Sequence, residues 1–396
     1  MLRTLLAAPL LGAGAVRAQR TPAAQPLAAP RPLAQIAVGE RGELLGVARD
    51  GTVLALATGG WRTLGSGVDA RAPLAVGGGR VAGRAQAGGL WVVEGGRASV
   101  AAGPMLAPHA GFVVLPAGII AVAAQDEECG RLVRLEPTGA GWRETDRAAD
   151  PVLPDAQPVQ IDFDAPLAAA GGGHIAVLAG PDAQRYTHGV LGDAVEATRV
   201  LYLERHALTP IRTLTLQAPY VLEDFAPRPL DWQGRAALLT MRAGPQGAQL
   251  AVVAADAQRR DALALLALGP PIGQRNRWLS PATDGRRIAA VHTPHIGGVL
   301  HDYRADGGQL AAQRIADGVT AHTIGARELS LALWVGDALA VPTQDRRALR
   351  FYGGGTLAAQ AALPAAAVAT RPLARDGRAG VAALLEDGQL VWVPRP

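Results

Sequence analysis

Three histidines between positions 188 and 322 are the residues whose type could most readily do chemistry. His188, His295 and His322 are each followed within three residues by a glycine, which is typical of loops. If the three imidazoles converge, they could bind Zn²⁺ or another transition metal. A carboxylate ligand or general base could come from Asp193, Glu196, Glu223 or Asp224. The alternative is that these histidines bond loop backbone and only hold the loops, because no H-x-x-x-H spacing supports a metal.

A second set of candidates consists of arginines in the same loops, namely Arg185, Arg277, Arg327 and Arg346, with Tyr186 beside the first. Guanidinium groups suit carboxylates, phosphates or acidic sugars, and Trp278, at the start of a strand, could stack on a glycan. The alternative is that the arginines pair with Asp193, Glu223, Asp224 and Glu328. The predicted ligand-binding set is Arg185, Tyr186, His188, Asp193, Glu196, Arg277, His295, His322, Arg327 and Glu328.

Sequence templates for catalysis are missing. No G-x-S-x-G elbow and no Cys-x-x-Cys pair occurs, and the glycine runs at 77–79, 171–173 and 353–355 open no helix. No residue is therefore predicted to be catalytic. An enzyme on these loops would have to be a metal-assisted hydrolase or oxidoreductase that uses the histidine and carboxylate cluster.

Composition argues against a nucleic-acid partner. All 38 basic residues are arginine, which raises the isoelectric point to about 9.8, but the net charge is only +4. The arginines alternate with acids and form no stripe or arm, so nucleic-acid binding is not expected. The 49 glycines and 29 prolines suit a protein with many turns and few helices.

The elements that must position these residues are short strands in a repeated unit. Residues 277–316 predict strands at 278–283, 287–292, 299–303 and 309–315, separated by turns with Asp, Gly and Pro. Similar units begin at Gly42, Gly79, Gly118, Gly173, Gly234, Gly285, Gly336 and Gly377. Repeats of roughly 40–60 residues with several strands each predict an all-β propeller of seven or eight four-stranded blades, with eight favoured. The last unit lacks an outermost strand, which residues 21–29 could supply and so close the ring.

Propeller topology places the candidate loops on one face. Strands A to D run up and down from the axis outward, so A–B turns lie on one face and B–C loops and D-to-A connections on the other. The long polar segments 180–198, 219–229, 269–277, 293–298, 321–328 and 343–347 are all of the second kind. Long loops on a rigid scaffold are where function usually resides.

Several phrases between Arg185 and Arg350 resemble a known family. RYTHGVLGDAVEA, VLEDFAPRPLDWQGR, GPPIGQRNRWLSP, HTPHIGGVL, AHTIGARELSLA and VPTQDRRALR occur in order. They resemble exported bacterial FG-GAP/VCBS-repeat proteins, whose propeller is like that of the integrin α-subunit head. The resemblance covers somewhat under half of the chain and implies the fold rather than an activity.

The chain departs from that family at the A–B turns. The family commonly has a D-x-D-G-D-G calcium loop there, and calcium requires several carboxylates among its oxygen ligands. Here the turns retain one acid each, Asp231, Asp284 and Asp376, and Arg235, Arg286 and Arg378 follow them. We therefore expect that calcium binding is lost and that these acids are turn formers.

The N-terminal segment predicts export. Residues 1–18 have the pattern of a signal peptide, with Arg3, an apolar stretch and small residues before position 19. Residues 19–32 form a Pro- and Ala-rich linker or the closing edge strand, and 33–396 a single propeller domain. Cys129, the only cysteine, excludes an intrachain disulfide, and the acids before it should raise its pKa.

These observations predict a periplasmic or secreted, monomeric, non-enzymatic binding or scaffold module. Its partner would be an envelope or extracellular protein, or a small acidic or glycan ligand, and no transmembrane segment is expected. No cofactor is expected, with zinc as the alternative. A third possibility is a propeller whose ancestral site has decayed together with its calcium loops.

Overall fold

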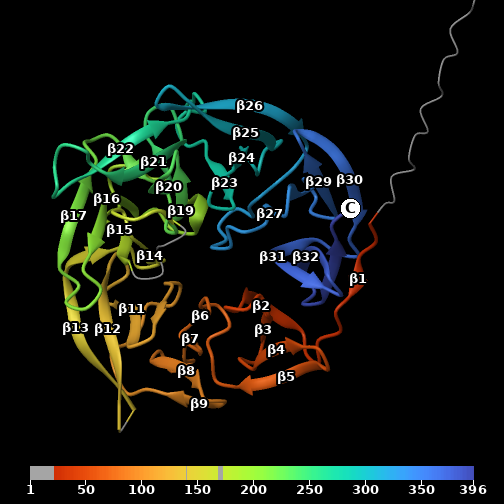
Figure 1. Cartoon of the computed structure of the whole chain (residues 1–396), viewed down its shortest axis with the longest axis horizontal. Helices are drawn as coiled ribbons and strands as arrows, with labels where there is room; N and C mark the ends of the chain where they lie inside the picture. The colour runs from red at the N-terminus through yellow and green to blue at the C-terminus, as the bar shows by residue number, and fades with distance from the viewer. Residues whose placement is uncertain (1–21, 140, 168–172) are drawn as a thin grey trace, which may run out of the picture.

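The structure is a computed structural model that describes residues 22–139, 141–167 and 173–396. It is a ring of antiparallel β-sheets around a central axis (Figure 1), which confirms the predicted all-β propeller. Within the described residues the strands group into eight blades. The predicted signal peptide, residues 1–18, lies outside the described residues.

The first four blades contain β2 to β17. Blade 1 consists of β2 (Leu33–Val38), β3 (Leu44–Ala48), β4 (Val53–Ala57) and β5 (Gly60–Gly65). Blade 2 consists of β6 (Ala75–Gly77), β7 (Arg80–Arg84), β8 (Leu90–Glu94) and β9 (Arg97–Val100). Blade 3 consists of β10 (Val113–Leu115), β11 (Gly118–Ala124), β12 (Gly130–Thr138) and β13 (Gly141–Val152). Blade 4 consists of β14 (Val159–Ile161), β15 (His174–Asp182), β16 (Glu196–Leu203) and β17 (Pro210–Thr215).

The remaining four blades contain β19 to β33 and β1. Blade 5 consists of β19 (Arg228–Trp232), β20 (Arg235–Ala243), β21 (Gln249–Ala255) and β22 (Leu263–Leu268). Blade 6 consists of β23 (Leu279–Thr283), β24 (Ile288–His292), β25 (Val299–Asp306) and β26 (Gln309–Asp317). Blade 7 consists of β27 (Leu333–Val335), β28 (Ala338–Pro342), β29 (Ala348–Gly353) and β30 (Thr356–Ala362). Blade 8 consists of β31 (Ala367–Arg375), β32 (Arg378–Leu385), β33 (Leu390–Pro394) and β1 (Gln25–Pro26).

The ring closes by joining the two ends of the chain. In β1, Gln25 pairs with Trp392 and Pro26 with Val391 of β33, and the Leu27 amide donates to Leu390 at 2.9 Å. Figure 1 shows β1 beside the C-terminal blade. Proline suits this outermost position, because an edge strand needs no donor on its outer side. The N-terminal segment thus supplies the strand that the last repeat lacks and covers an edge that would otherwise be open.

Among the described residues, six hydrophobic clusters hold the ring together, most of them between neighbouring blades. Examples are the cluster of Leu331 and Phe351 with Val381 and Val393 between blades 7 and 8, and that of Val47 and Trp91 between blades 1 and 2. Alternate residues of each strand therefore face opposite neighbours, and this explains why the inner strands are apolar on both faces. No helix in the described residues is long and apolar enough to cross a membrane.

Blades 3 to 5 are joined into one sheet by extra pairing near the ends of their strands. Val152 of β13 pairs with Ala179 of β15. The two-residue strand β18 (Val221–Leu222) lies between blades 4 and 5, where Leu222 pairs with Ala197 of β16 and also with Arg242 of β20. This strand fixes the position of the residues that follow it, Glu223 and Asp224.

The two faces of the ring differ as the topology requires. We call the face that carries segments 183–195, 269–277, 293–298, 321–328 and 343–347 the loop face, and the face that carries the A–B turns at 233–234, 284–287 and 376–377 the turn face. Neighbouring loops on the loop face bond directly, as when the Gly325 amide donates to the Val190 carbonyl at 2.9 Å. The turns opposite are short, and Asp376 and Gly377 both have positive φ, as a two-residue hairpin turn needs.

Candidate functional site

A histidine–carboxylate pair lies at the centre of the loop face. His188 precedes the short 3-10 helix η2 (Gly189–Leu191) and bonds through Nδ1 to Glu223 Oε1, while the Glu223 side chain is fully buried. The second oxygen, Oε2, has no hydrogen-bond partner among the described residues. Burial raises the pKa of Glu223 to about 7, although His188 opposes the shift. This carboxyl can therefore hold a proton near neutral pH.

Further buried carboxyls lie around Glu223. Glu196, the first residue of β16, is buried, and burial together with the Glu223 carboxylate raises its pKa well above its usual range. Burial and Asp193 raise the pKa of Asp155 to about 6. Acids in such positions favour the neutral form because water is excluded and like charges are close. Perturbed acids of this kind are more common at functional sites than in structural cores.

Trp278 and two histidines form the second part of the site. The indole of Trp278 lies parallel to the His295 ring, with 6.2 Å between centroids, and 4.8 Å from the His322 ring. Its Nε1 donates to the Glu223 carbonyl at 3.2 Å, and this bond connects the two parts. His295 Nε2 lies 2.9 Å from His322 Nδ1, so one ring donates to the other. Burial lowers the pKa of His322 to about 4, and this ring stays neutral.

Arg327 connects three segments of the loop face. It bonds to Asp155 at 3.0 Å and to Asp193, which belong to the connection before blade 4 and to the η2 loop. Gly192 makes room for it, because a Cβ there would lie 2.5 Å from Arg327 Nη1. The remaining charges of the predicted set are also paired or bonded: Glu328 with Arg371, and Arg185 with Asp182 and two backbone carbonyls. The alternative that these arginines and acids pair with each other therefore holds for Arg327 and Asp193, whereas Arg185 and Glu328 pair with residues outside the predicted set.

We define the loop-face cluster as His188, Glu196, Glu223, Trp278, His295 and His322. The structure brings these residues together from blades 4, 5, 6 and 7. Arg277 and Arg346 lie outside it: Arg277 donates to the Asn276 carbonyl, and Arg346 to Thr323 and the Ala367 carbonyl.

Some members of the predicted ligand-binding set cannot touch a ligand at the surface. Tyr186, Glu196 and His322 are 0, 2 and 2 % exposed, because their loops fold inward over the ends of the strands. The Tyr186 hydroxyl accepts the Asn276 amide at 2.9 Å, and Arg275 covers its ring. Trp278 is 2 % exposed, so the proposed stacking on a glycan is wrong for this conformation.

The metal hypothesis for His188, His295 and His322 receives no geometric support. No group of three or more His, Cys, Asp or Glu side chains in the described part of the chain is arranged to hold a metal ion. Both nitrogens of His322 are engaged, Nδ1 with His295 and Nε2 with the Ala326 carbonyl at 2.7 Å. That second bond is of the kind expected if the histidines hold the loops. A metal at these three residues stays a prediction that would require these bonds to open.

Two of the three acids at the A–B turns, Asp231 and Asp284, bond to their own turns. Asp231 Oδ1 accepts the Gly234 amide at 2.8 Å, and Asp284 Oδ1 accepts the amides of Arg286 and Arg287. These bonds are those of turn-forming aspartates. Cys129 is free, and burial and Asp126 raise its pKa.

Sequence reasoning missed two apolar residues at the tips of neighbouring loops. Ile296 and Ile324 are 60 and 68 % exposed, which makes them the most exposed large apolar side chains that the structure describes. Ile296 directly follows His295, Ile324 comes two residues after His322, and each precedes a glycine, in HIGG and TIGA. The sequence could have indicated these residues, because an isoleucine inside a polar, glycine-containing loop has no core to pack against and is therefore expected to be exposed.

Comparison with known proteins agrees with the fold. No family model and no curated protein matches the sequence. Among solved structures the chain is similar to Sqt1 of Saccharomyces cerevisiae, with a TM-score of 0.58, 10 % identity and coverage of 95 % of this chain and 98 % of that one. It is also similar to BamB of Moraxella catarrhalis, with a TM-score of 0.54, 11 % identity and coverage of 94 % and 96 %.

A third similar structure is the computationally designed Ika8 protein, with a TM-score of 0.51, 11 % identity and coverage of 93 % of this chain and 99 % of that one. At such low identity the likeness shows the fold alone. The chain is a β-propeller, and its similarity to BamB and Sqt1 extends over nearly its whole length.

Proposed function

We propose that this protein is an exported binding module that docks a protein of the envelope or extracellular space on its loop face. The observation that carries the proposal is the exposed pair Ile296 and Ile324 on adjacent, braced loops. Exposed apolar side chains inside a polar rim are typical of protein-binding patches. The likeness to propellers and the FG-GAP/VCBS resemblance agree with a binding role but leave the partner open.

The loops that carry these isoleucines are held in place before any partner arrives. Gln344 fixes the loop of Ile296, because its Oε1 accepts the Gly298 amide at 2.9 Å and its Nε2 donates to the Pro294 carbonyl at 2.7 Å. The loop of Ile324 is held by the Gly325 amide, which donates to the Val190 carbonyl at 2.9 Å. Trp278 packs below His295 and His322. A patch that is already ordered loses less conformational entropy on binding, which favours affinity.

The charge around the patch indicates what kind of partner it fits. Arg275 and Arg277, in the connection 269–277, and Arg346, in the loop 343–347, lie on the same face, and none of them forms an ion pair with a described residue. Elsewhere on this face the charges are balanced, as in the bridge from Arg327 to Asp155 and Asp193. We therefore infer that the partner presents apolar side chains beside acidic ones.

Photo-crosslinking in the cells that make the protein tests this proposal. Benzoylphenylalanine is placed at position 296 or 324, and at position 357 as the control. Leu357 is 50 % exposed, but lies at the turn-face end of β30. We expect a discrete adduct from positions 296 and 324 that is absent from position 357. Changing Arg275, Arg277 and Arg346 to glutamine should weaken the adduct, because the acidic side of the contact loses its partners.

Adducts of equal yield from all three positions, or none from 296 and 324, would contradict the proposal. The alternative function, a metal-assisted hydrolase or oxidoreductase, is favoured only by the His188–Glu223 pair, which orients an imidazole as a general base requires. Elemental analysis of protein purified without chelator separates the two. Stoichiometric zinc that is lost in His188→Ala and His295→Ala variants would support the enzyme.

A further inference from the structure

A second pair of exposed apolar side chains lies on the loop face, across the ring from Ile296 and Ile324. Val100, the last residue of β9, is 55 % exposed, and Met105, in the connection to blade 3, is 56 % exposed. The connection after the last strand of a blade opens on the loop face, so both pairs face the same way. Figure 1 shows β9 on the opposite side of the axis from β24 and β29.

Both side chains of this second pair lie against the B–C loop of blade 2. A Cβ on Gly88 would collide with the Met105 methyl group, and one on Gly89 would lie 4.0 Å from Val100 Cγ1. The Leu106 amide donates to the Gly88 carbonyl at 2.8 Å, which fixes the connection to the loop. The pair is therefore held at the surface by its backbone, as the two isoleucines are.

Three acids without a paired cation lie beside Val100 and Met105. The Met105 carbonyl accepts an amide at the end of β11 at 2.8 Å, and the next loop along the chain carries Asp126, Glu127 and Glu128. All three acids are exposed, and none of them forms an ion pair with a described residue. The arginine that follows this loop donates to a glutamine side chain at 2.8 Å instead. We call Val100, Met105 and these three acids the acidic patch.

The two isoleucines have arginines around them instead. Arg346 donates to the side chain of the residue before Ile324, and Arg275 and Arg277 lie in the connection that leads into blade 6. None of the three arginines forms an ion pair with a described residue, and the aspartate in the loop of Arg346 is bonded within its own turn. We call Ile296, Ile324, Arg275, Arg277 and Arg346 the basic patch.

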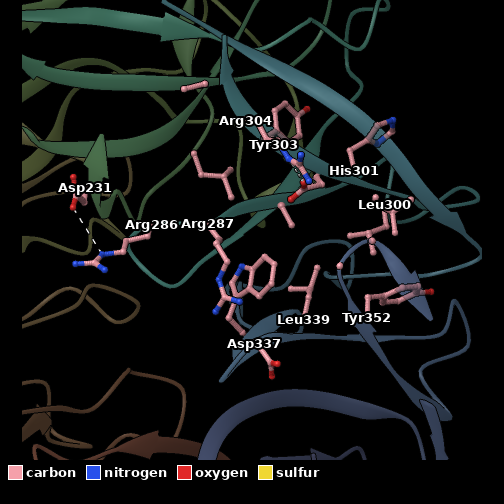
Figure 2. A pocket seen from close by; sticks show the side chains of 18 of the residues that line it. Asp231, Arg286, Arg287, Leu300, His301, Tyr303, Arg304, Asp337, Leu339 and Tyr352 are labelled. Carbon is pink, nitrogen blue, oxygen red and sulfur yellow. Dashed lines mark hydrogen bonds and ion pairs between the residues drawn. The ribbon is translucent and has the colours of Figure 1, made fainter. Parts of the chain in front are cut away.

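The turn face has no such surplus of charge. It contains a hollow of about 420 Å³ between blades 6 and 7, which we call the turn-face pocket and whose walls include Trp334 and Tyr352. Figure 2 shows Arg286 directed toward Asp231 rather than into this hollow. Aspartates match the surrounding arginines one for one, in the pairs Arg286–Asp231, Arg287–Asp284, Arg304–Asp302 and Arg395–Asp337. Complementary charge for a second molecule is therefore found on the loop face.

We propose that the protein forms a twofold dimer in which two copies meet loop face to loop face, with the acidic patch of each on the basic patch of the other. A twofold axis that lies between the two faces, midway between the patches, brings each patch onto its counterpart. Such a contact uses both patches of both copies and stops at two, because no complementary surface is left over. Opposite charges fix the orientation, and the apolar pairs supply the buried area. This assembly differs from the monomer expected from the sequence.

The dimer goes beyond the proposed function and can be tested apart from it. Ile296 and Ile324 can contact only one molecule at a time, so an envelope partner would have to displace the second copy. In the crosslinking experiment a second copy gives an adduct of twice the mass of the chain, which distinguishes it from another protein. Purified protein alone shows whether the dimer exists, so either proposal can fail without the other.

Sedimentation velocity of the purified protein over a range of concentrations tests the dimer. We expect an equilibrium between monomer and dimer that shifts toward the monomer as salt screens the charges. Glu127→Arg/Glu128→Arg and Arg275→Glu/Arg277→Glu should each weaken dimerisation by about tenfold, since each brings like charges together. A chain with all four changes should recover the dimer, because the charges are complementary again with their signs exchanged.

Apolar substitutions test the other part of the contact. Met105→Ser and Ile324→Ser should each weaken the dimer, whereas Leu357→Ser, the matched control, removes a similarly exposed side chain from the turn face and should leave it unchanged. Thermal unfolding shows whether each variant is folded. A monomer at every concentration, an assembly larger than two, or a dimer that neither charge reversal weakens would overturn the proposal. So would a chain with all four charge changes that stays monomeric, since the two patches would then not face each other.

Discussion

The loop-face cluster and the turn-face pocket use the same kinds of side chain in opposite ways. On the loop face the Glu223 carboxyl is buried and only half bonded, so its pKa rises to about 7. On the turn face the Asp284 carboxyl is also partly buried, but amide and guanidinium hydrogen bonds from Arg287 and its neighbour more than offset that, and its pKa falls. The first arrangement stores a proton, whereas the second stabilises a turn.

The two carboxyls have opposite effects on the stability of the fold. A charged turn aspartate with several donors lowers the free energy of the folded state. A buried carboxyl with an unpaired oxygen raises it and has to be compensated elsewhere. The ring provides that compensation through β18, which holds Glu223 in place by pairing with both β16 and β20. On the loop face, the buried Glu223 carboxyl therefore lowers the free energy of unfolding.

The largest expected effect compares two tryptophans, one from each face. Trp278 is buried below the loop-face cluster, whereas Trp334 is a partly buried wall of the turn-face pocket. Trp278→Ala should cost about 3–5 kcal/mol in the free energy of unfolding, because it leaves a cavity and frees the Glu223 carbonyl. Trp334→Ala should cost clearly less, since its Nε1 has no partner to lose. Urea unfolding of both variants checks the order, and an equal or reversed cost would remove the distinction between the faces.

The propeller scaffold on which both faces are built could be predicted from the sequence. The strands expected at 278–283, 287–292, 299–303 and 309–315 correspond to β23 to β26, with no end shifted by more than three residues. These strands could be predicted because short apolar runs alternate with Asp-Gly and Gly-Gly turns, and the conformation of such a turn depends on its own residues. Grouping the long loops on one face followed from the up-and-down order of the strands.

The site itself was less predictable, because it depends on pairing between distant residues. That Glu223 is buried follows from the pairing of Leu222 with Ala197 and Arg242, which no local pattern indicates. Tyr186 was expected at the surface because its neighbours are polar, but the η2 loop turns it inward. The turn-face pocket left no signal at all, because its walls combine Arg287 from the turn before β24 with Leu339 of β28 and Tyr352 of β29.

The second prediction concerns how the loop face responds to pH. The folded-state pKa of Glu223 is raised above its unfolded value near 4.5, so its contribution to stability is present at low pH and is lost as pH rises through about 7. Glu223→Gln keeps the shape and cannot ionise. The variant should therefore gain on the order of 2 kcal/mol relative to the native protein between pH 5 and pH 8, since one pKa unit is worth about 1.4 kcal/mol.

Urea unfolding at several pH values measures this difference. Glu127→Gln is the control, because Glu127 is an exposed acid in a B–C loop outside the cluster. Its curve should run parallel to that of the native protein. If the Glu223→Gln curve is parallel as well, the buried carboxyl does not titrate with a raised pKa, and the contrast between the two faces loses its electrostatic basis.

The smallest expected effect has the opposite sign and belongs to the turn face. The pKa of Asp284 is lowered, so its contribution is present above the unfolded value near 3.8 and is lost as pH falls through the folded value. Asp284→Asn retains an oxygen for the turn but gives up the charge that bonds to Arg287 at 2.6 Å. We expect a loss of about 0.5–1 kcal/mol at pH 7 that is smaller at pH 3, below the unfolded pKa of 3.8. Asp306→Asn, in the exposed turn before Gly307 of the same blade, should change little at either pH. A loss in Asp284→Asn that grows as pH falls would mean that folding raises the pKa of this acid, as it does for Glu223.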